Sequence, residues 1–239
     1  MNYLAHLTLS YPSAGLVVGN FIGDHVRNKD LVHFTKEVRL GIDMHRRIDS
    51  FTDKHKASTA IREKLFADYR HTSRILVDIY YDHFLAVYFE QFHHQSLGTF
   101  NDKITALLQQ YMNIMPPSAQ GYLRGMQAQN WLLEYSSVAG IGVILNKMAN
   151  RSGLHLLQSG ARSLEHHYDF FKMQFLKFYP ELMGHWVFGF TTRFSTGRQG
   201  CISKPCGRYP PRRPGLRPCR DGSDFVKQLG RGHSKRLYV

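Results

Sequence analysis

The sequence has little cysteine, and all of it lies near the carboxyl end. Cys201, Cys206 and Cys219 are the only cysteines in 239 residues, so the first 192 residues contain none. An odd number of cysteines argues against a disulfide framework, and the body of the chain offers no thiolate for a metal. Long apolar runs are absent too, because none approaches the ~18 residues of a membrane-spanning helix.

Several catalytic signatures are also missing. The chain contains no phosphate-binding loop of the GxxxxGK type, no GxSxG nucleophile elbow and no HExxH zinc motif. A serine or cysteine nucleophile therefore has no support in the sequence. The opening segment, residues 1–7, lacks the basic start of a secretory signal. We expect a cytoplasmic protein that does not associate with membranes.

The apolar and polar alternation that marks β-strands is weak throughout, whereas helical spacing is strong. The composition, 43% hydrophobic and 13% aromatic, is ample for one sizeable core. We predict an all-α fold, with a single helical domain over residues 1–192. One stripe at helical spacing runs through Val38, Ile42, His45, Asp49 and Asp53, and a second runs through Val77, Tyr81, Phe84, Tyr88 and Phe92. Further helices are expected near residues 100–115, 119–135, 138–149 and 154–179.

Residues 193–239 have a different composition from the rest of the chain. They contain 12 of the 31 Lys and Arg residues, only 2 of the 18 Asp and Glu residues, and 5 of the 9 prolines. Such a segment buries too little apolar surface to offset its ordering entropy, so we predict a disordered basic tail. Three interpretations stay open: a weak nucleic-acid contact, a solvated extension without a role, and a shifted reading frame at the end of the gene.

Acidic and histidine residues occur at helical spacing within two apolar stretches. His45, Asp49 and Asp53 follow one another at intervals of four, as do Asp78 and Asp82. Residues four apart share a helix face, with Cβ atoms about 5–6 Å apart, so each pair could close on one divalent cation. Two such helices facing each other could supply a complete set of nitrogen and oxygen ligands. This ligand chemistry suits Mn²⁺, Fe²⁺, Mg²⁺ or Zn²⁺.

Each of these side chains, taken alone, has an ordinary structural interpretation. Asp43 fits a solvated helix face, and Asp53 fits a helix end. The clustering among aromatic and aliphatic residues argues for more, because charged groups are rarely buried unless they pair or bind metal. His6 and Asp24 lie in two further apolar segments, and the glycines before Asp24 permit close packing. We interpret the pattern as a metal site for hydrolysis by activated water.

Several separated motifs together carry a resemblance to a known family. They are Met1-Asn2-Tyr3-Leu4-Ala5-His6-Leu7, Gly19-Asn20-Phe21-Ile22-Gly23-Asp24, Met44-His45-Arg46-Arg47-Ile48-Asp49, Asp82-His83-Phe84-Leu85, Asn146-Lys147-Met148-Ala149 and Phe178-Tyr179-Pro180-Glu181. In this order, and over about residues 1–185, the chain resembles the acyl carrier protein (ACP) phosphodiesterases, which are holo-ACP hydrolases related to HD phosphohydrolases. The basic tail matches nothing in that family.

The resemblance implies a fold like that of the HD phosphohydrolases and a metal-dependent, Mn²⁺-preferring phosphodiesterase. That activity removes 4′-phosphopantetheine from holo-ACP to give apo-ACP and is linked to fatty acid biosynthesis. The His-Asp doublet of HD proteins is reversed here, as Asp82-His83. The predicted metal ligands are Asp24, His45, Asp49, Asp78 and Asp82. Arg46 is predicted to stabilise charge on the phosphate, and His6 or His83 to protonate the leaving oxygen.

The partner implied by the resemblance is an acidic carrier protein, which favours a basic docking surface. The predicted docking residues are Arg39, Arg47, Lys54, Lys56, Arg62 and Arg70. Two alternatives remain: a metal-dependent nucleotide phosphohydrolase that shares the site but not the partner, and a basic nucleic-acid-binding protein driven by the tail. Comparing phosphopantetheine release from holo-ACP with nucleotide hydrolysis would distinguish the first alternative from the predicted activity. Nucleic-acid binding that weakens steeply with salt would identify the second.

Overall fold

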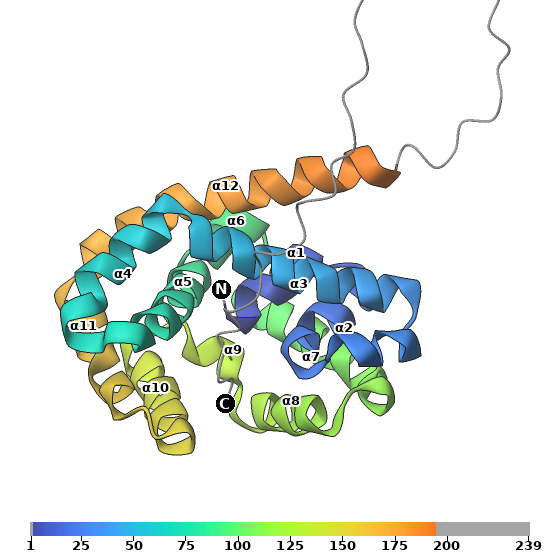
Figure 1. Ribbon diagram of the computed structural model, residues 1–239, viewed down its shortest axis with the longest axis horizontal. Helices are drawn as coiled ribbons and strands as arrows, with labels where there is room; N and C mark the ends of the chain where they lie inside the picture. The colour runs from blue at the N-terminus through green and yellow to red at the C-terminus, as the bar shows by residue number, and fades with distance from the viewer. Residues whose placement is uncertain (1, 195–239) are drawn as a thin grey trace, which may run out of the picture.

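A computed structural model describes residues 2–194, and the regular secondary structure in this range consists of helices, with no strand (Figure 1). The all-α prediction is therefore confirmed for these residues. The predicted domain boundary at residue 192 falls in the last turn of the final helix, which ends at Phe194. Almost all of the predicted tail lies outside the described residues. Within residues 2–194, no helix combines the length and the apolar character that a membrane span requires.

The α-helices of the described part follow one another through short turns and 3₁₀ segments. Their bounds are α1 (Tyr3–Ser10), α2 (Ala14–Phe21), α3 (Lys36–Lys54), α4 (Lys56–Tyr69), α5 (Ser73–Val87), α6 (Phe89–His93), α7 (Leu97–Gln110), α8 (Pro117–Gln129), α9 (Trp131–Glu134), α10 (Val138–Ser152), α11 (Gly160–His166) and α12 (Tyr168–Phe194). A 3₁₀ turn, η1 (Gly23–His25), links α2 to the segment before α3.

Hydroxyl side chains begin several of these helices. Ser13, Thr35, Ser96 and Ser137 accept a hydrogen bond from a main-chain N–H in the first turn of α2, α3, α7 and α10. These N–H groups have no partner within their own helix, so the caps satisfy donors that would otherwise be lost. Gly153, at a φ of 71°, ends α10 in the left-handed conformation that glycine adopts easily.

Two helices predicted as continuous are divided in the structure. The prediction for residues 119–135 breaks at Asn130, whose left-handed φ of 47° separates α8 from α9. The prediction for residues 154–179 divides into a 3₁₀ turn, α11 and the start of α12. Gly160 lies at this division, where a Cβ would come within 2.7 Å of side-chain atoms of Leu76 and Leu145. Close packing on α5 and α10 therefore overrides the local helical pattern.

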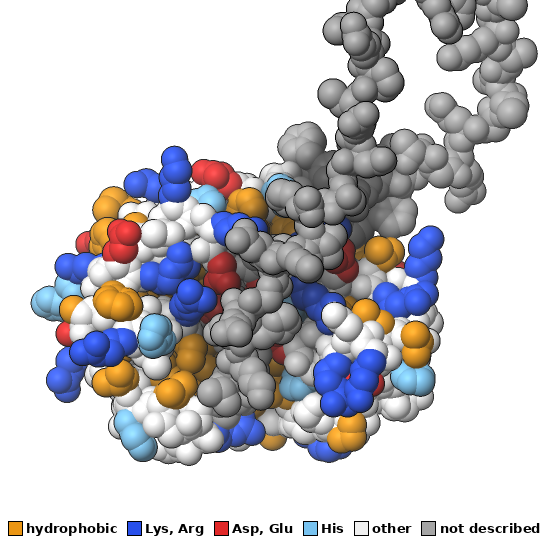
Figure 2. Space-filling model, viewed as in Figure 1, with side chains coloured by type: hydrophobic (Ala, Val, Ile, Leu, Met, Phe, Trp, Pro, Cys, Tyr) orange, Lys and Arg blue, Asp and Glu red, His pale blue; other side chains and the backbone are white. Residues whose placement is uncertain are grey.

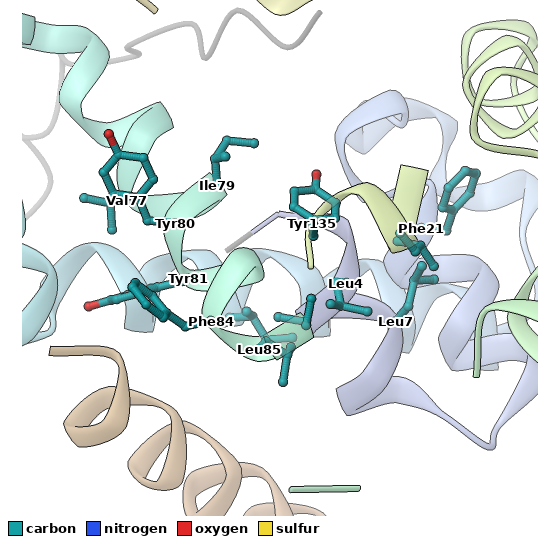
Figure 3. Packing of buried hydrophobic residues seen from close by; sticks show 14 of the residues in the cluster. Leu4, Leu7, Phe21, Val77, Ile79, Tyr80, Tyr81, Phe84, Leu85 and Tyr135 are labelled. Carbon is teal, nitrogen blue, oxygen red and sulfur yellow. The ribbon is translucent and has the colours of Figure 1, made fainter. Parts of the chain in front are cut away.

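The core is built around α5, which is buried on several sides. Eleven of its fifteen residues are buried, among them Ile79, Tyr80, Phe84 and Leu85. Figure 3 shows Leu85 of α5 beside Leu4 of α1, and these side chains belong to one buried cluster with Leu7 of α1 and Phe21 of α2. The long helix α12 closes the other side, and its Phe178 ring stacks on Tyr81 with centroids 4.3 Å apart. This packing holds α1 between α5 and the pair α2 and α3.

Candidate metal centre

The site begins with the contact between α2 and α3. A Cβ at Gly19 would lie 2.8 Å from the Gly41 Cα, and a Cβ at Gly23 would lie 2.7 Å from the His45 Cβ. These glycines let α3 approach α2 and η1 more closely than side chains would permit. The close approach places His45, on the buried face of α3, against the end of α2.

Four polar side chains converge at this contact. His6 Nε2 lies 3.3 Å from Asp49 Oδ1, while His45 Nε2 lies 3.5 Å from Asp49 Oδ2 and 3.0 Å from Asp24 Oδ1. The His6 and His45 rings are stacked, with centroids 4.0 Å apart. The two imidazoles are buried, and both carboxylates keep only slight exposure, at 13% for Asp49 and 14% for Asp24. We call these four residues the α1–α3 cluster.

Asn20 fixes the orientation of both imidazoles. Its side-chain Oδ1 lies 2.8 Å from His6 Nδ1, and its main-chain carbonyl lies 2.8 Å from His45 Nδ1. Carbonyl oxygens only accept, so each Nδ1 donates its proton to Asn20 and each Nε2 faces the carboxylates. Asn20 Nδ2 also donates to the His6 carbonyl at 3.0 Å, which fixes the direction of its amide.

Burial and neighbouring charges shift the pKa values of His6, His45 and Asp49. Burial acts to lower the pKa of His45, but the Asp24 and Asp49 carboxylates outweigh it and the pKa is raised. Burial lowers the pKa of His6, and the neighbouring His45 adds to this effect. The pKa of Asp49 lies well below its ordinary value, because the hydrogen bond and charge of His6 overcome the opposing effect of burial. The cluster therefore keeps anionic carboxylate oxygens beside two imidazoles.

The donor set fits a divalent cation. Ligand atoms of His6, His45 and Asp49 all lie within 4.8 Å of one another, so they could hold one metal ion. Among the described residues, the buried His45 Nε2 has no well-directed hydrogen-bond partner, although Asp24 Oδ1 lies 3.0 Å away. A buried polar atom of this kind is costly unless something binds it. Metal-ligating histidines also characteristically donate their other N–H to a carbonyl or carboxylate, as His6 and His45 do to Asn20.

Comparisons with known proteins agree with the sequence motifs. The profile of the family described as acyl carrier protein phosphodiesterase matches residues 1–182. The chain belongs to this family. Curated relatives named acyl carrier protein phosphodiesterase include those of Photorhabdus laumondii and Serratia proteamaculans. Each is 32% identical to this chain over 185 residues, which cover 77% of the chain and 93% and 96% of the respective relatives. No solved structure matches the chain, so the resemblance to the HD fold stays a prediction.

Three of the five predicted metal ligands, Asp24, His45 and Asp49, lie together in the α1–α3 cluster. Asp24 follows α2, whereas His45 and Asp49 lie one turn apart on α3. His6 joins them from α1, although the sequence had suggested it as a proton donor. Asn20 lies in one of the family motifs, but the sequence alone predicts no role for it. An amide side chain in a glycine-rich apolar helix is the signal that could have identified it.

The α5 carboxylates do not belong to the cluster, contrary to the prediction that α3 and α5 would share a metal. Asp82 is fully buried, and its two oxygens accept the main-chain N–H groups of Leu4 and Ala5, at 2.7 Å and 3.4 Å. It caps the first turn of α1, where the helix dipole favours a negative charge. Asp78 lies one turn earlier on the same helix. Among the described residues, the ligand atoms that lie within 4.8 Å of one another belong to His6, His45 and Asp49, and Asp78 is not one of them.

His83 is also separated from the cluster. Its Nδ1 donates to the Tyr135 carbonyl at 2.7 Å, and its Nε2 lies 3.1 Å from the Tyr168 hydroxyl. Both ring nitrogens thus contact protein groups, at Tyr135 just after α9 and at Tyr168 of α12, and burial lowers the pKa of this imidazole. The prediction that His83 protonates a leaving group at the metal is not supported by this position.

The basic residues near the cluster differ in what they contact. Arg46 donates to Asn28 Oδ1 at 2.7 Å and to the Val26 carbonyl at 3.3 Å, so it ties α3 to the segment after η1 rather than facing the cluster. Arg62 is half-buried and donates to the Asp53 carbonyl and to Thr59. The other predicted docking residues are exposed: Arg39, Arg47, Lys54, Lys56 and Arg70.

Proposed function

We propose that this protein is a metal-dependent phosphodiesterase that hydrolyses 4′-phosphopantetheine from holo-ACP and releases apo-ACP. Fatty acid biosynthesis would be the process it serves, and Mn²⁺ the preferred metal, with Mg²⁺ or Fe²⁺ as substitutes. The observation that carries the proposal is the convergence of His6, His45 and Asp49, with their ligand atoms within 4.8 Å of one another. Relatives that share 32% of their residues with this chain are named for the same activity.

A bound divalent cation would supply the positive charge that lowers the pKa of a water and polarises a phosphoryl oxygen. His6, His45 and Asp49 would hold the cation, with Asp24 beside His45. Asn20 holds both imidazoles through their Nδ1 atoms, so that each Nε2 is aimed at the site. His6 is assigned to metal binding rather than to proton transfer, because Asn20 fixes its Nδ1 and Asp49 lies against its Nε2.

The decisive experiment is mass spectrometry of holo-ACP incubated with the purified protein and Mn²⁺. Loss of the phosphopantetheine mass, with appearance of apo-ACP and free 4′-phosphopantetheine, is expected. Chelation should stop the reaction, and Mn²⁺ should restore it better than Ca²⁺, which prefers more oxygen ligands. A parallel series of nucleotides tests the alternative phosphohydrolase: nucleotide turnover without loss of phosphopantetheine would overturn the proposal.

Docking of the acidic carrier protein is proposed to use the exposed face of α3. Arg47 and Lys54 line an open hollow of about 500 Å³ that also includes Phe51 and His55. Both basic residues lie on the same helix as His45 and Asp49. On the face shown in Figure 2, Lys and Arg side chains are spread over the surface that the grey atoms leave visible and do not gather in one patch.

The docking proposal predicts a salt-sensitive KM. Added salt should raise KM for holo-ACP and leave kcat less changed, because screening acts mainly on association. The double variant Arg47→Gln with Lys54→Gln should raise KM several-fold and weaken this salt dependence. Lys103→Gln on α7, outside the hollow, is the matched control. A KM that changes neither with added salt nor in the double variant would point to a different docking surface.

A further inference from the structure

A second cavity lies between α8, α9 and α10, beside the amino end of α1. Its volume is about 420 Å³, within the range of small-molecule sites. The aromatic rings of Tyr122, Trp131 and Tyr135 form much of its wall, and Gly121 and Gly125 leave room on α8. The interior is therefore suited to methyl and methylene groups.

Polar groups complete the lining of this cavity. Lys147 and Arg151, four residues apart on α10, both line it. Lys147 Nζ and Trp131 Nε1 donate to the same Gln129 Oε1, so these three side chains form one fixed polar edge. A ligand that combines carbonyl or hydroxyl acceptors with apolar segments would match both the edge and the aromatic wall.

The cavity is connected to the α1–α3 cluster through α1. Asn2 lines the cavity, and His6, one turn further along the same side of the chain, belongs to the cluster. Four residues of helix rise by about 6 Å. Tyr3 bridges the same gap: its ring stacks on Tyr122 with centroids 4.5 Å apart, and its hydroxyl lies 3.3 Å from Nε2 of His25, the neighbour of Asp24.

We propose that this cavity binds the pantetheine arm of the substrate while its phosphate lies at the α1–α3 cluster. The inference rests on the proposed function. The arm is an extended chain with two amides, a hydroxyl and a pair of methyl groups, and by backbone dimensions it spans about 10 Å or more. This length covers one helical turn of α1. The methyl and methylene groups contact Tyr122, Trp131 and Tyr135, and the carbonyl oxygens accept from Lys147 and Arg151.

The test fills the cavity without disturbing the metal ligands. A Cβ at Gly121 would meet no atom within 4 Å, so Gly121→Leu should fold, and replacing glycine within a helix favours the helix. We expect KM for holo-ACP to rise at least tenfold in Gly121→Leu. The matched control is Gly98→Leu on α7, where a Cβ would meet only Ser96 Oγ at 3.9 Å. Arg151→Met should raise KM roughly tenfold, the loss expected for a hydrogen bond to a charged donor.

A second readout uses free pantetheine, which carries no phosphate and is not hydrolysed. Saturation-transfer NMR should show contact between its methyl groups and the wild-type protein and the Gly98→Leu variant, but not Gly121→Leu. If holo-ACP is hydrolysed while Gly121→Leu changes neither KM nor pantetheine contact, this inference fails and the proposed function stands. If pantetheine binding is lost in Gly121→Leu but holo-ACP is not hydrolysed, the cavity assignment stands and the proposed function fails.

Discussion

Helices α3 and α5 carry the same kinds of polar residue among apolar neighbours but use them differently. On α3, His45 and Asp49 meet His6 and Asp24, and within residues 2–194 the His45 Nε2 has no well-directed hydrogen bond. On α5, both carboxylate oxygens of Asp82 and both ring nitrogens of His83 have hydrogen-bond partners within the protein. Buried polar groups that are fully satisfied stabilise a fold, whereas a converging set with an unsatisfied nitrogen favours a ligand.

The largest expected effect separates the two helices by activity. His45→Ala or Asp49→Ala should lower kcat by about 10²-fold or more, because each removes a proposed metal ligand. Both variants should remain helical by circular dichroism. Steady-state turnover of holo-ACP with Mn²⁺ is the measurement. Near wild-type turnover in both variants would make the α3 pair structural, like the α5 pair.

Asn20 provides the second prediction, on metal affinity rather than on turnover. Asn20→Ala removes the side-chain acceptor of His6 but leaves the main-chain acceptor of His45. Loss of such an orienting partner costs 10–100-fold in metal affinity in other proteins, and we expect a similar loss here. Isothermal titration with Mn²⁺ measures it. Asn20→Asp, which keeps an acceptor for His6 Nδ1, should recover part of the affinity, and equal affinities in all three proteins would exclude the orienting role.

The third prediction concerns stability, and it applies to α5. Asp82→Ala leaves the buried N–H groups of Leu4 and Ala5 without their acceptor, a loss of about 1–3 kcal/mol in the free energy of unfolding. Urea denaturation measures this loss. Asp82→Asn keeps one acceptor and should be milder. Metal affinity, measured on folded protein, should change little in Asp82→Asn. A large loss of Mn²⁺ affinity in Asp82→Asn would indicate that Asp82 is a metal ligand.

The smallest expected effect is the contribution of His93 to the change of the free energy of unfolding with pH. Its Nε2 lies 2.8 Å from the Tyr179 hydroxyl, and burial lowers its pKa from 6.5 to about 4. Between these values the unfolded chain binds a proton that the folded protein does not, so this contribution to stability is lost as pH falls from about 6.5 to about 4. Thermal melts of wild type and His93→Gln over this range should show a shallower acid decline in the variant. If the melting temperatures of both proteins fall equally with pH, His93 does not contribute to the pH dependence of stability.

The sequence by itself determined the helical class and the residues of the α3 pair. Spacing of four places His45 and Asp49 on one helix face in any helical fold, and apolar neighbours on that face require its burial. The family motifs likewise identified the segments that supply His6, Asn20 and Asp24. These conclusions depend on local geometry and composition, which a single sequence contains.

Only the tertiary structure decided which segments face the α3 pair. The pattern on α5 predicts a second ligand pair as readily as α3 does, but α1 packs between them and presents N–H groups to Asp82 and the His6 ring to Asp49. Likewise, helix spacing could not show that Asn20 would hold two imidazoles or that Arg46 would turn toward Asn28. The role of each polar residue depends on partners distant in sequence, and packing around glycine contacts and aromatic rings selects those partners.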